Sequence, residues 1–271
     1  MKNIREPAVA GMFYPASPDK LKEEIGALLE SAKPDEDYRD VLGIVVPHAG
    51  YIYSGRTAAF AYNAAASQTY KTIVIISPSH REYFPGISVF DGDAYKTPLG
   101  IVEINKDLRE KLCDGKDIFA GIKGHGAEHA VEVQIPFLQE LFGNFKILPV
   151  VLGDQSKRNV NLLSEKLAEI IDDETLIVAS SDLSHFYPKP VASGLDSLIE
   201  THINNSDYEG LQRDLDERKC EACGGGAIVT LLKTAGLLRK NKSKVLSRSD
   251  SGDVSGDNSE VVGYLSAVVH K

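Results

Sequence analysis

Three histidines stand where apolar runs of the sequence end, and imidazoles in such places can bind a metal ion or move protons. The stretches "VVPHAG", "IISPSH" and "VASSDLSH" place His48, His80 and His185 at or just beyond the ends of these runs. Neutral imidazole is the commonest side-chain ligand for transition metals. A single histidine here would more often cap a turn or bond at a strand end, but three that converge favour a metal site.

Cys223 is a candidate for a further ligand. It precedes a glycine run and an apolar pattern with helical spacing over residues 226–238, so we expect it at a helix N-terminus. The helix dipole at that position predicts a lowered thiol pKa. Cys220 and Cys223 also form a C-x-x-C, which could mean a dithiol redox pair, although no strand leads into it. Cys220 follows a charged run and is interpreted as a bystander.

The stretch "GHGAEHAVEVQIP" contains an H-x-x-E-H pattern from His125 to His129, which one class of zinc peptidases uses. Glycines on both sides of His125 argue against a continuous helix, and without one the two imidazoles do not share a face. We therefore expect a helix that starts within residues 128–131, with His129 and Glu132 supporting the site from behind the ligands. A peptidase is not expected.

The elements that must position these residues alternate between strands and helices. Strands that are apolar on both faces, separated by helices, indicate an α/β sandwich with a mostly parallel or mixed sheet covered on both sides. Such a sheet brings the carboxyl ends of its strands, and thus the histidines, to one edge. We predict a single domain over residues 1–271. The expected strands are 41–46, 71–77, 145–153, 175–181 and a final strand in 260–271; the expected helices are 17–34, 57–67, 128–143, 156–173 and 226–238; an antiparallel hairpin is expected in 86–108 and a glycine-rich loop in 247–260.

The composition narrows the class of protein. The chain has 271 residues, 42% of them hydrophobic and 25% charged, which is typical of a soluble globular protein. Its formal charge of −9 argues against nucleic acid or an anionic membrane as a partner. No signal peptide or membrane span is evident, and three cysteines do not make a disulfide framework. A cytoplasmic location is expected.

Six motifs, in order along nearly the whole chain, resemble the Memo-like family, which includes Memo and the AmmeMemoRadiSam system protein B. They are "AGMFYP", "PHAGYIYSG", "SPSH", "EHAVEVQIPFL", "SSDLSHF" and "GDVSGDNSEVVGY". The family fold is similar to that of class III extradiol (LigB-type) non-haem iron dioxygenases. The resemblance implies that His48, His80 and Cys223 bind one metal ion. It also implies that His185 acts as acid and base, and that Asp182 is a pocket aspartate, which we expect to fix the tautomer of His185.

The resemblance further implies a pocket lined by aromatic residues, but the chain departs from its relatives in two places. Tyr51 and Tyr53 of the second motif would line the pocket. Many members carry Trp-Tyr where this chain has Phe13 and Tyr14, and the chain has no tryptophan. In the dioxygenases the third metal ligand is a glutamate, whereas here it is Cys223. The softer sulfur suits Fe(II), which we expect, or copper or zinc, and catechol ring cleavage does not follow from the fold.

Two functions of different kinds are compatible with these residues. The first is a non-haem metal-dependent oxidoreductase, using iron or copper, of unknown substrate. The alternative is a non-catalytic protein that uses the same pocket to bind a small molecule or a peptide, such as a phosphotyrosine-type peptide, or that serves as an accessory to a radical SAM partner.

Overall fold

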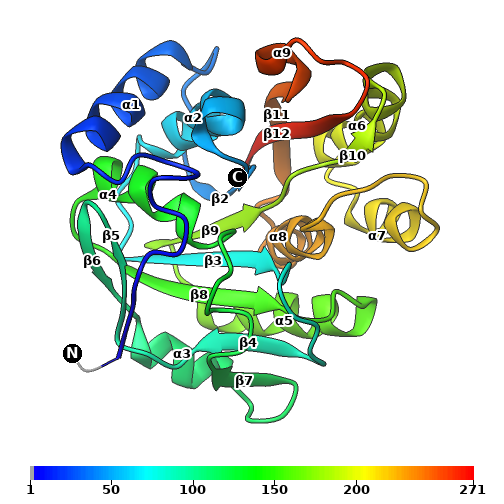
Figure 1. Ribbon diagram of the computed structural model, residues 1–271. Coiled ribbons are helices and arrows are strands. Elements are labelled where there is room, and N and C mark those ends of the chain that lie inside the picture. The colour runs from blue at the N-terminus through cyan, green and yellow to red at the C-terminus, as the bar shows by residue number, and fades with distance from the viewer. Residues whose placement is uncertain (1–2) are drawn as a thin grey trace.

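The computed structural model describes residues 3–271, and its centre is a nine-stranded mixed sheet (Figure 1). The central strands β2, β9, β3 and β8 are parallel, while β12 and β4 run antiparallel to β2 and β8. From one edge to the other the order is β10 (His185–Tyr187), β12 (Val261–His270), β2 (Val41–Val46), β9 (Thr175–Ser180), β3 (Thr72–Pro78), β8 (Lys146–Leu152), β4 (Ile87–Phe90) and β7 (Ile118–Gly121), and β11 (Lys242–Asp250) also pairs with β12.

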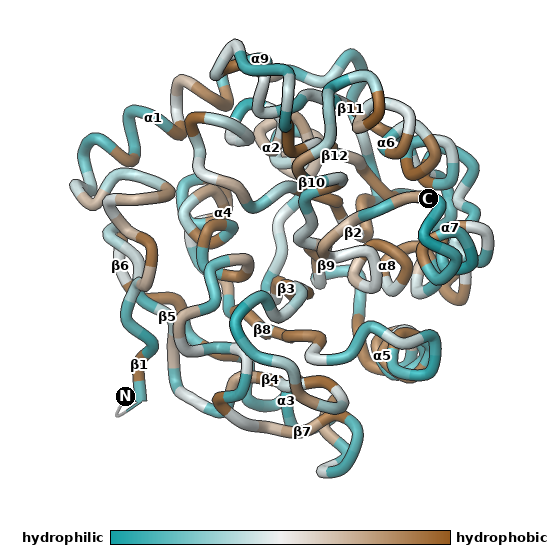
Figure 2. Tube along the Cα trace, turned by 45° about the vertical axis from the view of Figure 1, so that its right-hand side comes forward, coloured by the Kyte–Doolittle hydropathy of each residue, from teal (hydrophilic) through white to brown (hydrophobic). Residues whose placement is uncertain are grey.

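Helices cover both faces of this sheet. One face carries α1 (Pro18–Ser31), α2 (Tyr51–Ala65) and α4 (Ile135–Phe142). The other carries α3 (Lys106–Leu112), α5 (Lys157–Ile170), α6 (Lys189–Asn204), α7 (Tyr208–Asp216) and α8 (Gly225–Leu237). Alternate strand residues enter opposite cores, so that Ile44 faces the first set of helices and Val45 the second. The predicted α/β sandwich is confirmed. Figure 2 shows apolar segments along β8 and α8, in the middle of the molecule, whereas the peripheral α7 is mainly hydrophilic.

A second, three-stranded sheet lies beside the main one. It consists of β1 (Ile4–Arg5), β5 (Ala94–Thr97) and β6 (Gly100–Glu103), with β5 between the others. The antiparallel hairpin predicted within 86–108 is therefore made by β5 and β6 alone. The first part of that segment, β4, leaves the hairpin and joins the main sheet, because its four residues are all buried and need cover on both faces.

Three predicted elements differ from those observed. The helix expected at 57–67 begins earlier, at Tyr51, whose backbone N–H bonds to the Phe13 carbonyl oxygen. The helix expected from residue 128 begins only with the short 3-10 helix η1 (Glu132–Gln134), which leads into α4. The segment expected as a loop at 247–260 contains the end of β11 and the short helix α9 (Gly252–Ser255). Within residues 3–271 no helix combines the length and apolar character needed to cross a membrane.

The register of the sheet aligns the ends of three strands. Val46 at the end of β2 pairs with Ser180 at the end of β9, and Ile76 in β3 pairs with Ala179 in β9. The loops that follow β2, β9 and β3 therefore leave the sheet side by side at one edge, as the sequence predicted for the loops that carry the histidines.

Candidate metal centre

Three side chains from different elements converge at this edge. His48 follows β2, His80 follows β3, and Cys223 immediately precedes the glycine run that opens α8. One ligand atom of each lies within 4.8 Å of those of the other two. The Cys223 Sγ is 3.1 Å from His48 Nε2. Two imidazole nitrogens and one sulfur form a donor set that iron, copper and zinc all accept.

The hydrogen bonds of Ser180 determine the tautomer of His48. The Ser180 hydroxyl donates its single hydrogen to the Ala130 carbonyl oxygen at 2.8 Å and accepts from Gln134 Nε2 at 2.8 Å. His48 Nδ1 lies 2.9 Å from the same oxygen and must therefore be the donor of that bond. The lone pair is left on Nε2, which faces Cys223. His48 is thus oriented as a metal ligand.

Burial keeps the imidazole of His48 neutral. The side chain is 1% exposed, and this desolvation lowers the pKa of His48 well below its ordinary value. Positive charge on His80, His129 or His185 would lower that pKa further. A neutral imidazole is the form that binds a metal.

Glu128 holds His80 in the corresponding way. Its carboxylate accepts the His80 backbone N–H at 2.6 Å and lies 2.9 Å from His80 Nδ1. Burial acts to raise the pKa of Glu128, but the hydrogen bonds from His80, a positive charge on His80 and the bond from the Ala130 N–H outweigh it and lower that pKa to about 2. An ionised carboxylate only accepts, so His80 Nδ1 donates and Nε2 is free for a metal. A carboxylate behind a ligating histidine is a common support of metal sites.

Asp182 contacts Cys223 through its backbone. The Asp182 backbone N–H points at Sγ over 3.2 Å, and the Cys223 N–H donates to the Asp182 carbonyl oxygen at 3.2 Å. The prediction of a lowered thiol pKa is wrong. Burial raises the pKa of Cys223, as does the Asp182 charge, and these effects exceed that of the backbone N–H groups nearby. Binding of a metal must displace the thiol proton.

Asp182 and His185 lie beside this cluster, but they are not bonded as expected. The Asp182 carboxylate accepts the His48 backbone N–H at 2.7 Å, and burial raises its pKa to about 7. His185 Nδ1 lies 2.8 Å from the Leu183 carbonyl oxygen and donates to it, which leaves the lone pair on Nε2. Leu183, and not Asp182, therefore sets the tautomer of His185, because the oxygen of its own loop is the acceptor within reach. Burial lowers the pKa of His185.

His129 and Phe13 form an aromatic wall next to the ligands. The His129 ring stacks on His80 with centroids 4.9 Å apart, meets His48 edge-on at 5.4 Å, and contacts Phe13 at 4.8 Å. His129 thus packs against the imidazoles of both candidate ligands.

Glu132 and Tyr14 lie outside the ligand cluster. Glu132 is fully buried, pairs with Arg5 at 2.5 Å and accepts the Tyr14 hydroxyl, so both residues anchor the N-terminal segment. Tyr51 is also buried, with its hydroxyl on the Val133 carbonyl oxygen, whereas Tyr53 is 42% exposed.

The H-x-x-E-H pattern does not bring its two histidines to one site, although Glu128 and His129 lie with His80 in a second group whose ligand atoms are within 4.8 Å of one another. His125 is buried, its Nδ1 lies 2.9 Å from the Tyr95 hydroxyl, and its Nε2 lies 3.3 Å from the Ser88 carbonyl oxygen. Both ring nitrogens are occupied by structural partners, whereas Glu128 supports His80.

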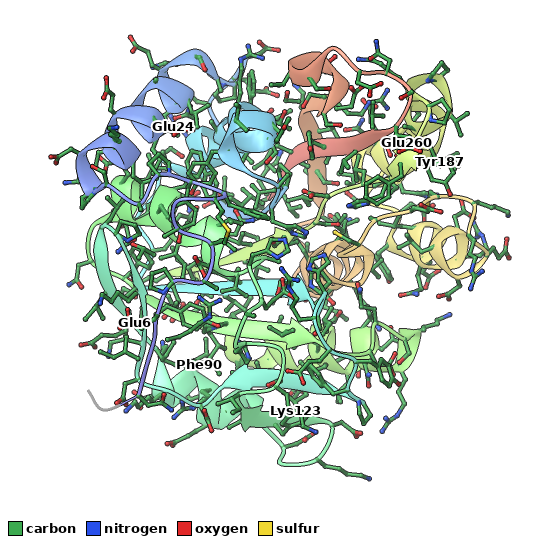
Figure 3. All side chains as sticks on the ribbon, in the orientation of Figure 1. Glu6, Glu24, Phe90, Lys123, Tyr187 and Glu260 are labelled. Carbon is green, nitrogen blue, oxygen red and sulfur yellow. The ribbon has the colours of Figure 1, made fainter. Side chains whose placement is uncertain are left out.

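A cavity of about 530 Å³ adjoins the cluster. Cys223 and His185 line it, together with the apolar side chains of Leu183 and Leu215 and the charged side chains of Arg218 and Glu221. Glu221 accepts the hydroxyl of Tyr187, which Figure 3 labels on the side of the molecule that carries β10. The volume is in the range of small-molecule sites. Cys220 lines the same cavity but is 1% exposed and packs in the core.

Comparisons with known proteins place the chain in a family. A family model described as Memo-like protein matches residues 5–268. The chain belongs to the Memo-like family. A MEMO1 family protein of Methanosarcina barkeri is 39% identical over 270 residues, covering 98% of this chain and 100% of the relative. MEMO1 family proteins of Thermoplasma volcanium and Thermoplasma acidophilum are 38% and 40% identical, with 98% and 97% of this chain and 98% of each relative covered.

The solved structures show a likeness of fold. An uncharacterized protein from Escherichia coli K12 matches with a TM-score of 0.52 at 15% identity, over 84% of this chain and 98% of that one. The likeness in fold extends over most of this Memo-like chain.

The residues that hold the ligands from behind were missed by sequence reasoning. Ser180 and Gln134 support His48, and Glu128 supports His80. The H-x-x-E-H pattern was a signal for Glu128, but it suggested a ligand pair instead of a carboxylate behind another histidine. Ser180 had no local signal, because it is one of two adjacent serines at the end of β9.

Proposed function

We propose that this Memo-like protein is a metal-dependent oxidoreductase that holds one redox-active ion through His48, His80 and Cys223. The observation that carries the proposal is the convergence of two imidazoles and one thiol. The Nδ1 atom of each imidazole is already engaged as a hydrogen-bond donor. A structural histidine has no need for its second nitrogen to face another ligand atom. Side chains arranged in this way are preorganised for a metal ion.

The charges around the cluster favour a divalent ion. With a metal bound, a Cys223 thiolate and the Glu128 carboxylate would carry one negative charge each. The Asp182 carboxylate, whose Oδ2 lies 4.0 Å from His48 Nε2 and whose pKa burial raises to about 7, would add further negative charge when ionised. A divalent cation balances more of this charge than Cu(I), and unbalanced charge is costly in a largely buried site. Fe(II) is therefore the ion we propose, with copper as the redox-active alternative; zinc also fits the donor set but could only polarise a substrate.

The chain itself would bind the substrate and move its protons. Such an ion supplies electron transfer or polarisation of a bound substrate when it is present. A small molecule in the adjoining cavity would lie against Leu183 and Leu215 and face the Nε2 lone pair of His185. That nitrogen is placed to accept a proton from the ligand, and the Leu183 carbonyl would hold the resulting imidazolium in place.

A second candidate is a non-catalytic protein that binds a ligand at the same metal centre and cavity. It is favoured by large apolar side chains that are exposed at the loops of the site. Ile52 is 70% exposed in the first turn after His48, Tyr83 is 79% exposed soon after His80, and Phe186 is 70% exposed next to His185. Such side chains could contact an apolar peptide or a partner protein.

Metal analysis of untagged protein purified without air tests the proposal. We expect nearly one equivalent of iron or copper in the wild type and in His185→Ala, and a loss of most of it in His48→Ala and Cys223→Ser, because removal of one of three ligands leaves the shell incomplete. An equal loss in His185→Ala would contradict its role beside the metal. A folded wild type that refuses Fe(II), copper and zinc would favour the second candidate.

A further inference from the structure

Cys223 lies in a short turn that the Gly225 N–H closes by donating to the Ala222 carbonyl oxygen at 3.1 Å. Three glycines follow it, and glycine restricts the backbone less than any other residue. The residue itself precedes α8, so no helical hydrogen bond fixes its carbonyl group. The position of Sγ relative to His48 Nε2 therefore depends also on contacts from elsewhere in the chain.

Gln155, in the loop after β8, bridges this turn with both ends of its amide. Its Nε2 donates to the Cys223 carbonyl oxygen at 2.8 Å, and its Oε1 accepts the Gly226 backbone N–H at 2.8 Å. The Gly226 N–H is one of the first donors of α8, which have no partner within the helix. A Cβ at Gly226 would lie 2.9 Å from Gln155 Oε1 and 3.0 Å from its Cβ, so glycine permits this close approach.

The exit of β9 holds the other side of the same turn. The Gly224 N–H donates to Ser181 Oγ at 2.9 Å, and the Cys223 N–H donates to the Asp182 carbonyl oxygen. The Cys223 turn is thus clamped between the loops that follow β8 and β9. Gln155 contributes the clamp from the β8 side, and it is only partly buried, so its replacement need not disturb the core.

We infer that Gln155 is a positioning residue for the metal ligand Cys223, acting through the backbone on both sides of the thiol. The inference rests on the proposed metal-binding function. An amide is required, because the turn offers one acceptor and one donor. Glutamate could serve only the Gly226 N–H and would set an anionic oxygen against the Cys223 carbonyl.

The experiment compares the wild type with Gln155→Met and Gln155→Glu. Gln139→Met is the matched control, because Gln139 is also partly buried and hydrogen-bonded, to Thr97, but lies on α4 and has no bond to the Cys223 turn. Fe(II) affinity is measured by competition with a chelator. We expect affinity about 10- to 100-fold weaker in both Gln155 variants, and unchanged in the control, as is usual for supports of metal ligands.

A metal-free measurement distinguishes failure of this inference from failure of the proposed function. The rate of Cys223 alkylation by iodoacetamide, read by peptide mass, is expected to rise about fivefold to tenfold in Gln155→Met, because the lost hydrogen bonds free the turn. An unchanged Fe(II) affinity in Gln155→Met, with a wild type that binds Fe(II), overturns the inference. If the wild type binds no metal, the proposed function fails, and an alkylation rate equal to that of Gln139→Met then overturns the positioning role as well.

Discussion

Glu132→Gln tests how much the buried contacts between Glu132 and the N-terminal segment contribute to the free energy of unfolding. The Glu132 carboxylate is fully buried and accepts from Arg5 Nη1 at 2.5 Å, from the Ala8 and Val9 backbone N–H groups at 2.8 and 3.0 Å, and from the Tyr14 hydroxyl at 2.5 Å. Arg5 is itself only 5% exposed. Removal of one partner from a buried ion pair costs about 3–5 kcal/mol, because the other charge remains buried without compensation.

The amide of glutamine keeps the shape of the side chain but loses its charge. It also turns an NH₂ group toward two of the four donors, whichever way it is oriented. We therefore expect Glu132→Gln to lower the free energy of unfolding by about 3 kcal/mol, near the lower end of the range for a broken buried pair, since one carbonyl oxygen remains. Within a total of about 5–15 kcal/mol for a typical domain, that is a large loss.

Urea unfolding followed by circular dichroism measures this loss, and Glu103→Gln is the matched control. Glu103 pairs with Lys146 at 3.8 Å, with the two side chains 52% and 55% exposed, so its loss should cost less than about 1 kcal/mol. A cost for Glu132→Gln as small as that of the control would refute the view that the buried pair holds the segment. Metal content should be retained in the folded variant, because Glu132 contacts none of the three ligands.

Three further changes test separate parts of the structure. Ser180→Ala removes the acceptor of His48 Nδ1 and should weaken metal binding by about tenfold or more in a chelator competition; an unchanged affinity would contradict the assigned tautomer. Phe186 has a φ of 63° and is 70% exposed, so Phe186→Gly should stabilise the fold by about 1 kcal/mol in urea unfolding; a less stable variant would contradict the assigned backbone strain. Burial lowers the pKa of His125 to about 3, so the unfolded chain binds a proton first as the pH falls. Stability should therefore decline between about pH 6.5 and 3 with a slope of about 1.4 kcal/mol per pH unit, a contribution that His125→Gln should lack if the assignment holds.

The strands that carry the site were predictable because a strand that is buried on both faces appears in the sequence as a short run of apolar residues. The strand predicted at 41–46 has the observed bounds of β2, and those predicted at 175–181 and 71–77 differ from β9 and β3 by a residue at the ends. The rule that ligands gather beyond the carboxyl ends of parallel strands then brought His48 and His80 together. Strand β11 was not predicted, because most of its residues are polar and only partly buried. Its pairing with β12 is what makes it a strand.

The supports of the ligands were not predictable from local pattern. Gln155 is 68 residues from Cys223 in the chain, and Ser180 is 132 residues from His48. Hydrogen bonds between such distant residues depend on how the loops pack after folding. The wrong partner predicted for His185 has the same origin, because the Asp182 carboxylate accepts from the backbone of His48 and His185 Nδ1 bonds to Leu183 instead.

The short segment from Glu128 to Gln134 shows how one stretch of chain can organise a whole site. Its turn and single 3-10 helix direct successive polar side chains to different partners, which a continuous α-helix with its fixed faces would not do. Glu128 holds His80, while Gln134 and the Ala130 carbonyl hold Ser180 and through it His48. Glu132 binds the N-terminal segment, which places Phe13 in contact with the His129 ring. A substitution that extended the helix back to residue 128 would therefore disturb both ligating histidines together, even though it touched neither of them.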